Sequence, residues 1–407
     1  MKLSSSLILL IFAGLVAFLI RVYFTKFGLY YIDLISFQNW SSVLVVYGFK
    51  EFYSIELSPY PPGYLYILWF LGKIYYWGAA HSIPIPAELI LKMPSMLADI
   101  GNGFLIFFIA KMFTTEKKAL FAGLIFLFTP AFFANSTYWG QIDSFLSFFL
   151  LGSFYFLIKD RYLLSASLLG IAQIIKPIAI LSLPIFILFL ISKKRSFRQI
   201  STYLAVFIII ITPSFVPFNK DMNLIAFIVQ RNSTILEEFP AATNNAFNFW
   251  AIVSIFKSVN FQKVMDDILF LGLTYRSWGN LIFVSIYLSL LVIFWKYTKR
   301  SVLSLAFILT LCYSAMFLFL TRMHERHLFY GLAFMTLLWP LAKLKTKIVI
   351  LLAYIIYTVN IYYAYRLTTP PIFYLSPEIL SILSLINILI IFYLFKDLLS
   401  RIFKKEV

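Results

Sequence analysis

The sequence predicts an all-α polytopic membrane protein, built as a bundle of about twelve transmembrane helices. Of the 407 residues, 62% are hydrophobic and only 13% are charged, whereas soluble domains carry about 25% charged residues. Apolar runs long enough to cross a bilayer recur along the chain. Lysine and arginine residues gather between alternate pairs of these runs, as they do on the cytoplasmic side of membrane proteins.

A transmembrane helix needs about 20 mostly apolar residues, and the first such run begins at the N-terminus. This run resembles a signal peptide, but no small-residue cleavage site follows it before Arg21, so we expect a retained helix. Segments 162–175 and 177–192 are short for full spans. The predicted spans are residues 3–22, 88–110, 118–134, 141–158, 162–175, 177–192, 199–217, 278–295, 301–320, 328–342, 346–365 and 378–395.

The formal net charge of +17 would suit a nucleic-acid-binding protein, but the positions of the charges exclude that partner. The basic clusters fall in short loops on one side of the bundle, which the positive-inside rule makes cytoplasmic, together with both termini. Most acidic residues fall on the other side. The clustered basic residues are Lys111, Lys117, Lys118, Lys159, Arg161, Lys193, Lys194, Arg195, Arg198, Lys296, Lys299, Arg300, Lys343, Lys345, Lys347, Lys396, Arg401, Lys404 and Lys405.

The chain is predicted to form one transmembrane domain, residues 1–407, with two long outer loops at 23–87 and 218–277. The first loop is expected to carry catalytic residues, since the cytoplasmic loops are too short to hold a domain. Apolar residues at helical spacing predict surface helices at 33–47 and 64–77. We find no internal repeat, which disfavours an inverted-repeat transporter. Further surface helices in the second loop are predicted at 224–229 and 247–256.

Ionisable residues near membrane depth are costly and are therefore candidates for function. Asp33 begins the first predicted surface helix, where its carboxylate acts as a general base or merely caps the helix. Lys92 and Asp99 lie two turns apart on one helix face. Lys92 can neutralise a phosphate near the outer surface, whereas Asp99 is better suited to pairing with a neighbouring helix.

Segment 138–144 is a short outer turn that leads into a helix. Its Trp139, Gln141 and Asp143 offer a stacking face and hydrogen bonds for a sugar, although the helix dipole also explains an acid in the first turn. Lys176 separates two apolar runs with no acid nearby in sequence. A lipid phosphate would serve as its partner, and snorkelling to the interface is the alternative.

Segment 321–327 is the densest polar stretch predicted on the outer face. Its two arginines and two histidines surround one carboxylate, as expected of a site where fixed cations stabilise a departing phosphate. Interfacial anchoring is the alternative. A metal site is less favoured, because the two histidines are three residues apart rather than four. These residues are Arg322, His324, Glu325, Arg326 and His327.

Several common sites have no counterpart in the sequence. There is no Walker loop, no Gly-x-Gly-x-x-Gly and no Asp-x-Asp motif, so the sequence offers no known motif for binding a nucleotide-sugar or ATP. The single cysteine, Cys312, excludes an intrachain disulfide. An activated donor would therefore arrive through the membrane, and a polyprenyl phosphate carrying a sugar fits this requirement.

Short motifs follow one another in a definite order along the chain. They are Asp33…Phe37…Trp40, Gly48…Phe52-Tyr53, Tyr60-Pro61-Pro62-Gly63-Tyr64, Lys92…Pro94…Asp99, residues 139–144, Lys176-Pro177, residues 245–250 and residues 322–326. Together they resemble the GT-C superfamily of integral membrane glycosyltransferases, and most closely the mannosyltransferases related to the enzyme that adds the second mannose of GPI anchors. Each motif alone is weak, and the ordered set is specific.

This resemblance implies a GT-C-like bundle, a lipid-phosphate-sugar donor, an inverting single displacement, and no obligatory metal or other cofactor. It also implies an acidic base early in the first outer loop, and Asp33 matches that position. From their chemistry we expect Lys92, Lys176, Arg322 and Arg326 to bind the donor phosphate. Residues expected to bind sugar or acceptor hydroxyls are Trp139, Gln141, Asp143, Asn245, Asn248, His324 and Glu325.

The expected activity is transfer of a hexose, most often mannose, from a polyprenyl (dolichyl) phosphate to a glycan, glycolipid or protein acceptor at the extracytoplasmic face. The alternative is a secondary transporter or flippase for a lipid-linked or anionic substrate. Of three formal N-glycosylation sequences predicted on the outer side, at Asn39, Asn135 and Asn232, the first two lie beside predicted active-site residues. This position favours a prokaryotic plasma membrane over the endoplasmic reticulum.

Overall fold

The structure is a computed structural model that describes residues 4–27, 30–220, 222–255 and 264–404, without the side chains of residues 235 and 236. Each predicted span is helical over most of its described length, so the all-α architecture is confirmed. The bundle helices are α1 (Ser5–Phe24), α5 (Ala87–Ala110), α6 (Glu116–Phe128), α8 (Asp143–Ile158), α9 (Tyr162–Ile175), α10 (Ser182–Ser192), α11 (Phe197–Phe215), α14 (Tyr275–Tyr297), α15 (Val302–Phe319), α16 (Phe329–Thr336), α17 (Leu344–Arg366) and α18 (Pro377–Phe403).

Not all of these bundle helices have the length and apolar composition expected of a membrane span. Within the described residues, seven qualify, or eight if α6 and the segment Pro130–Trp139, bent by 43°, form one span. The predicted count of twelve is therefore not confirmed. Helices α8 and α9 and the segment Pro177–Ser192 are apolar but shorter. Helix α16 is buried along its whole length, and a helix enclosed by protein need not match the bilayer thickness.

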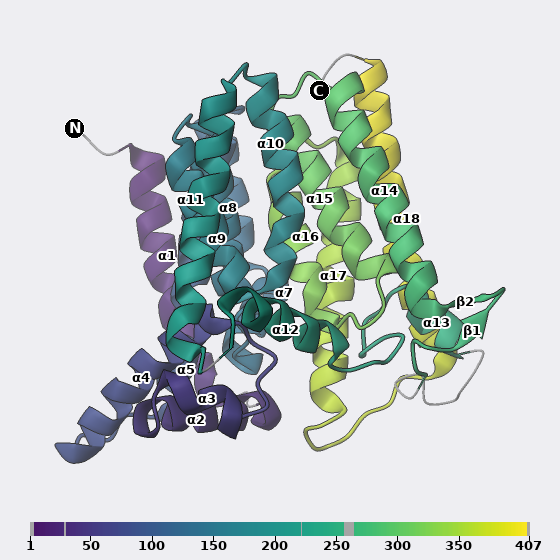
Figure 1. The fold of residues 1–407 in the computed structure, drawn as a ribbon. Helices are drawn as coiled ribbons and strands as arrows, with labels where there is room; N and C mark the ends of the chain where they lie inside the picture. Colours follow the sequence, from purple (N-terminus) through teal and green to yellow (C-terminus); the bar gives the residue numbers. More distant parts are fainter. Residues whose placement is uncertain (1–3, 28–29, 221, 256–263, 405–407) are drawn as a thin grey trace.

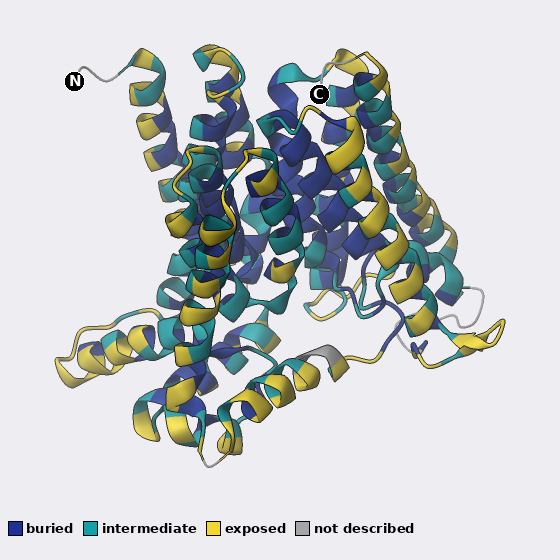
Figure 2. Ribbon diagram, turned by 45° about the horizontal axis from the view of Figure 1, so that its top comes forward, coloured by how far each residue is buried: buried dark blue, intermediate teal, exposed yellow. Residues whose placement is uncertain are grey.

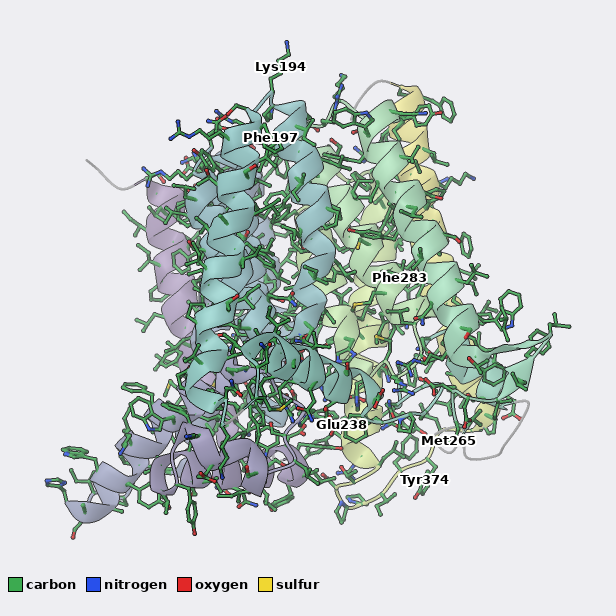
Figure 3. All side chains as sticks on the ribbon, in the orientation of Figure 1. Lys194, Phe197, Glu238, Met265, Phe283 and Tyr374 are labelled. Carbon is green, nitrogen blue, oxygen red and sulfur yellow. The ribbon has the colours of Figure 1, made fainter. Side chains whose placement is uncertain are left out.

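The two ends of the bundle differ in character. The helices run side by side, and the long loops gather at the end opposite the two termini (Figure 1). Lys194 projects at the end that carries the termini, whereas Glu238, Met265 and Tyr374 lie at the other end (Figure 3). Buried residues concentrate in the middle of the bundle, and the outer helices expose one face (Figure 2). We call the end that carries Lys194 the basic end, and the end that carries Glu238, Met265 and Tyr374 the loop end.

Helices also form in both long loops. The two predicted in the first loop are present as α2 (Tyr31–Val46) and α4 (Pro62–Ala80), and α4 begins at Pro62, where the missing N–H costs nothing. Ser41 of α2 donates a hydrogen bond of 2.9 Å to the carbonyl of Leu68 in α4, which joins the two helices. The remaining loop elements are α3 (Phe49–Ile55), α12 (Leu224–Glu237), α13 (Phe249–Ile255) and the hairpin strands β1 (Leu269–Phe270) and β2 (Leu273–Thr274).

A buried ion pair joins the first helix to the bundle. Arg21 of α1 places Nε 2.9 Å from Oδ2 of Asp99 in α5, and both side chains are almost fully buried. The hydroxyls of Ser136 and Ser144 also donate to the Asp99 carboxylate. The expectation that Asp99 pairs with a neighbouring helix is confirmed.

Removing one partner of this pair should be more harmful than removing both. We expect Asp99→Leu to lower the stability by about 3–5 kcal/mol, because it leaves the Arg21 guanidinium buried without a counter-charge. The double variant Arg21→Met/Asp99→Leu should lose less, since it leaves no buried charge. Thermal unfolding of the purified protein in detergent measures the difference, and equal losses in the two variants would contradict this account.

Candidate active site

A cavity of about 310 Å³ lies at the loop end of the bundle, within the range of roughly 300–1,000 Å³ typical of small-molecule sites. The first loop, the break after α9, the end of α12, the start of α14 and the segment after α15 form its walls. Several cations contribute to the lining. The polar lining residues discussed below are Tyr60, Lys176, Glu238, Arg276, Arg322, His324, Arg326 and His327.

Asp33 lies in the first turn of α2 and is partly buried. Its Oδ2 accepts a hydrogen bond of 2.6 Å from Trp139 Nε1 and another from the Gln141 amide. Its Oδ1 makes no hydrogen bond with any described residue. The Tyr60 hydroxyl donates to Gln141 Oε1 at 3.4 Å, and Tyr60 lines the cavity. Asp33 therefore does not serve as a helix cap. Its carboxylate is fixed through one oxygen, and Gln141 and Tyr60 connect it to the cavity, which Asp33 itself does not line.

A tight turn positions Trp139 and Gln141. Residues Ala134–Trp139 form one π-helical turn, and Gly140 follows with φ +84°, which favours glycine. The backbone N–H groups of Gly140 and Gln141 both donate to the Asn135 carbonyl at 3.0 Å. The Trp139 ring stacks on Tyr30 with centroids 4.1 Å apart. These contacts fix the two donors to Asp33.

Lys92 supports this turn from behind. Its buried ammonium donates to the carbonyls of Thr137, at 2.8 Å, and Tyr138, at 3.4 Å. Its aliphatic stem packs on Gly140, where an added Cβ would lie 3.0 Å from Lys92 Cγ. Lys92 is not among the residues that line the cavity. The structure therefore brings Lys92 to the turn, and its predicted phosphate-binding role stays without geometric support.

Lys176 has a partner that its sequence neighbourhood did not reveal. Its Nζ lies 2.6 Å from Oδ1 of Asp143, which also accepts a hydrogen bond from the Tyr330 hydroxyl. Asn135 donates to the other oxygen at 3.1 Å. No acid lies near Lys176 in sequence, and the structure supplies Asp143, which α8 brings to it from 33 positions away. The predicted contact of Lys176 with a lipid phosphate stays a prediction. Asp143 is fully buried in this network, whereas Lys176 reaches the cavity.

Arg326 connects the cavity with the surroundings of Asp33. Its Nη1 lies 2.9 Å from Oε1 of the buried Glu325. Its Nε is buried without a hydrogen-bond partner in the described part of the chain. The guanidinium lies 6.0 Å from the centroid of the Trp139 ring and interacts electrostatically with Asp33 and Asp143. Arg326 is therefore held by Glu325 while its side chain contributes to the cavity lining.

Arg322 is held at the cavity edge by an acid of the second loop. Its Nε lies 2.6 Å from Oδ2 of Asp266, and its Nη2 lies 3.0 Å from Oδ1. Thr321 donates to the same carboxylate at 2.9 Å. The backbone of Arg322 has φ +65°, a left-handed conformation, and its N–H donates to the Ala241 carbonyl at 3.1 Å. The second loop therefore orients this cation.

The two histidines of the segment are uncharged at neutral pH. Burial lowers the pKa of His324 and of His327 well below the usual value, and the neighbouring Arg326 and Lys176 charges add to this effect. His327 Nδ1 accepts a hydrogen bond of 3.3 Å from the His324 backbone N–H. Among the described residues, no group of three or more His, Cys, Asp or Glu side chains could hold a metal ion.

The two asparagines predicted to bind sugar have structural contacts. Asn248 is fully buried, accepts from the Ala251 N–H at 3.0 Å at the start of α13, and donates to the Phe317 carbonyl at 3.2 Å. The Asn245 backbone pairs with His324, and its carbonyl accepts from Asn360 at 2.6 Å. Neither asparagine is among the residues that line the cavity. Their predicted contacts with a sugar stay untested.

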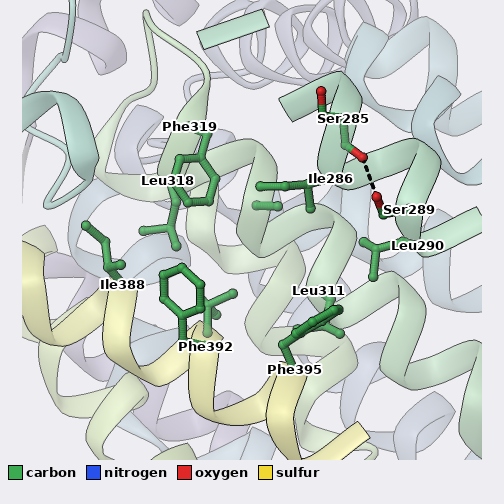
Figure 4. A pocket seen from close by; sticks show the side chains of 12 residues that line it. Ser285, Ile286, Ser289, Leu290, Leu311, Leu318, Phe319, Ile388, Phe392 and Phe395 are labelled. Carbon is green, nitrogen blue, oxygen red and sulfur yellow. Dashed lines mark hydrogen bonds between the residues drawn. The ribbon is translucent and has the colours of Figure 1, made fainter. Parts of the chain in front are cut away.

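A second cavity lies within the apolar part of the bundle. It has a volume of about 270 Å³ and is lined by residues of α14, α15 and α18, almost all of them apolar (Figure 4). Its polar members are Ser285 and Ser289, and Ser289 donates to the Ser285 carbonyl at 2.8 Å. Leu318 and Phe319 line this cavity, and Leu320 directly after them lines the cationic one. The two cavities are therefore neighbours along the chain at the end of α15.

Comparison with known proteins supports the family suggested by the motifs. Residues 60–217 match the dolichyl-phosphate-mannose-protein mannosyltransferase family. The chain is also 27% identical over 164 residues to GPI mannosyltransferase 1 of Saccharomyces cerevisiae. The predicted resemblance to GT-C mannosyltransferases is confirmed. The aligned segment covers 38% of this chain and 38% of the yeast protein, so the activity is argued below from the site itself.

Sequence reasoning gave no role to the lining residues Tyr60, Glu238 and Arg276, although Tyr60 belongs to one of the motifs that carry the resemblance. Tyr60 stands in the conspicuous Pro-Tyr-Pro-Pro segment, which could have identified it. The other two lie at the ends of α12 and α14, where charged residues are common and carry no distinctive signal. Burial raises the pKa of Glu238 to about 7, although the charge of Arg326 opposes this shift. Glu238 thus titrates near neutral pH inside the cavity.

The structure predicts a supporting role for Lys92 that differs from phosphate binding. We expect Lys92→Met to lower the stability by about 1–3 kcal/mol, because the carbonyls of Thr137 and Tyr138 lose their buried donor. Lys73→Met is the control, since Lys73 is exposed on α4. Thermal unfolding in detergent measures both. An unchanged unfolding temperature for Lys92→Met would remove the basis for this role.

Proposed function

We propose that this protein is an integral membrane mannosyltransferase. It transfers mannose from a polyprenyl-phosphate-linked donor to an acceptor hydroxyl, with inversion at the anomeric carbon. The observation that carries the proposal is the carboxylate of Asp33, fixed through one oxygen beside a cavity lined by Lys176, Arg322 and Arg326. The names of the matched family and of the yeast relative support mannose as the sugar.

Asp33 acts as the general base. Trp139 and Gln141 hold its Oδ2, so Oδ1 is the oxygen that accepts the acceptor's proton. The acceptor oxygen then forms a bond to the anomeric carbon from the side opposite the phosphate. The bond from that carbon to the phosphate oxygen breaks, and its electron pair stays with the phosphate. No general acid is required, because the group that leaves is polyprenyl phosphate, a phosphate monoester that departs as an anion.

Cations at the cavity stabilise the departing phosphate. Arg326 is best suited, because it lines the cavity and lies beside Trp139, which holds Asp33. Lys176 and Arg322 are each oriented by a carboxylate, and both line the cavity. Charged hydrogen bonds of this kind are roughly twice as strong as neutral ones.

The membrane supplies the donor. Its polyprenyl chain lies in the apolar cavity between α14, α15 and α18, and its phosphate reaches the cationic cavity past Leu320. The reaction takes place at the loop end, which the distribution of basic residues makes extracytoplasmic. A glycan, glycolipid or protein serves as acceptor. A prokaryotic plasma membrane is the location that the positions of Asn39 and Asn135 favour.

Replacing the base tests the mechanism directly. We expect Asp33→Asn to reduce transfer of radiolabelled mannose from polyprenyl-phosphate-mannose by about 10²- to 10⁴-fold, the usual contribution of a general base. Donor binding should persist, and donor-induced thermal stabilisation measures it. Glu51→Gln is the matched control, because Glu51 lies on α3 and forms a surface ion pair with Lys220.

Retained transfer in Asp33→Asn would exclude the base assignment. The same membranes should be tested with polyprenyl-phosphate-glucose. Equal transfer of glucose would contradict the mannose assignment, and movement of the lipid across the bilayer without any sugar transfer would identify a flippase instead.

The ionisation of Glu238 should make donor binding depend on pH. Below pH 7 Glu238 is mostly neutral, and above it the carboxylate repels the donor phosphate in the same cavity. We expect the donor KM to rise about fivefold between pH 6 and pH 8, the size of a repulsion across a partly solvated cavity. Glu238→Gln should abolish this rise, whereas Glu237→Gln, an exposed neighbour, should retain it. A rise that persists in Glu238→Gln would assign the titration to another group.

A further inference from the structure

A third cavity, of about 510 Å³, lies at the basic end of the bundle, between the start of α6 and the segment that joins α16 to α17. Three lysines, Lys117, Lys118 and Lys347, line it together with the Trp339 indole and an apolar wall. We propose that this cavity binds the phosphate headgroup of an anionic bilayer phospholipid. The proposal does not depend on the transferase activity.

The lysines of this cavity lack the acidic partners found at the loop end. In the described residues, no ion pair involves Lys117, Lys118 or Lys347, whereas each cation proposed to hold the donor phosphate pairs with a carboxylate. The two acids close by in sequence or contact, Glu116 and Asp397, pair with Lys111 and Arg401 instead. Three positive charges therefore face one concave surface with no carboxylate partner among the described residues, so all three would attract an anion placed there.

The start of α6 adds a further attraction for an anion. Thr115 precedes α6 but its side chain makes no capping hydrogen bond, so the first N–H groups of this helix have no side-chain acceptor there. Lys117 and Lys118 lie in the same first turn. A phosphate placed against this turn would meet N–H groups and ammonium groups together.

The rest of the lining suits a lipid better than a free phosphate. Trp339 is nine-tenths buried, and its indole N–H makes no hydrogen bond with any described residue. Lys347 Nζ lies 5.6 Å from the centroid of its ring. Phe121, exposed on the outer face of α6, and Leu341 extend the lining toward the bilayer. An indole beside lysines is typical of the membrane–water interface, and basic pockets between helices there bind phospholipid headgroups.

The experiment compares lipids of identical acyl chains on the purified full-length protein in neutral detergent. Native mass spectrometry counts bound phosphatidylglycerol and phosphatidylcholine, and inorganic phosphate is added as a competitor. We expect the wild type to retain one phosphatidylglycerol in preference to phosphatidylcholine, and Lys117→Gln/Lys118→Gln/Lys347→Gln to bind it at least about tenfold more weakly. Trp339→Phe, which keeps the ring but removes the N–H, should also weaken binding.

The matched control removes three exposed lysines of the same end outside the cavity, Lys193→Gln/Lys194→Gln/Lys299→Gln. This variant loses the same total charge but keeps the lysines of the cavity, so it should retain phosphatidylglycerol binding. Equal weakening in the two triple variants would overturn the proposal and indicate general surface attraction. Complete displacement of the lipid by millimolar inorganic phosphate would also overturn it, because the site would then recognise the phosphate alone.

Discussion

The turn at residues 134–141 is the feature on which the arrangement of the candidate site depends. Its side chains and carbonyls contact three buried charged groups: Ser136 donates to Asp99, Asn135 donates to Asp143, and the Thr137 carbonyl accepts from Lys92. Polar groups enclosed by helices must find partners within the protein, because an unsatisfied one costs several kcal/mol. One short segment therefore supplies partners to three charges from two helices and at the same time directs Trp139 and Gln141 toward Asp33.

This arrangement explains how a surface helix can carry the proposed base. Helix α2 lies outside the bundle, and its own sequence does not fix the direction of Asp33. The bonds from Trp139 and Gln141 tie that carboxylate to the turn. Packing of α2 on α4 and the contact of Tyr60 with Gln141 tie the rest of the loop to the same point. A base held in this way loses little freedom when an acceptor binds, which favours catalysis.

The sequence predicted where the helices lie, but it did not predict which residues pair with the charged side chains. Apolar runs fix the positions of helices because each must bury its apolar face, and the four surface helices were found for the same reason. The pairing of Lys176 with Asp143 escaped notice because the two residues are 33 positions apart in sequence, and only the packing of α8 against α9 brings them together. Lys92 illustrates the converse: a lysine near the outer surface suggests an anion site, yet its ammonium donates to carbonyls of the turn and of Thr25.

The two ends of the molecule differ in whether their cations form ion pairs with carboxylates. At the loop end Lys176, Arg322 and Arg326 each form an ion pair with a carboxylate. A bound phosphate must therefore share each of these cations with a carboxylate. Such pairing limits the affinity for an anion, which suits a site that must release its phosphate product after each turnover. At the basic end the lysines around Trp339 have no such competitor in the described residues. A lipid phosphate bound there would not compete with a carboxylate of the described residues, whereas the donor phosphate at the loop end would.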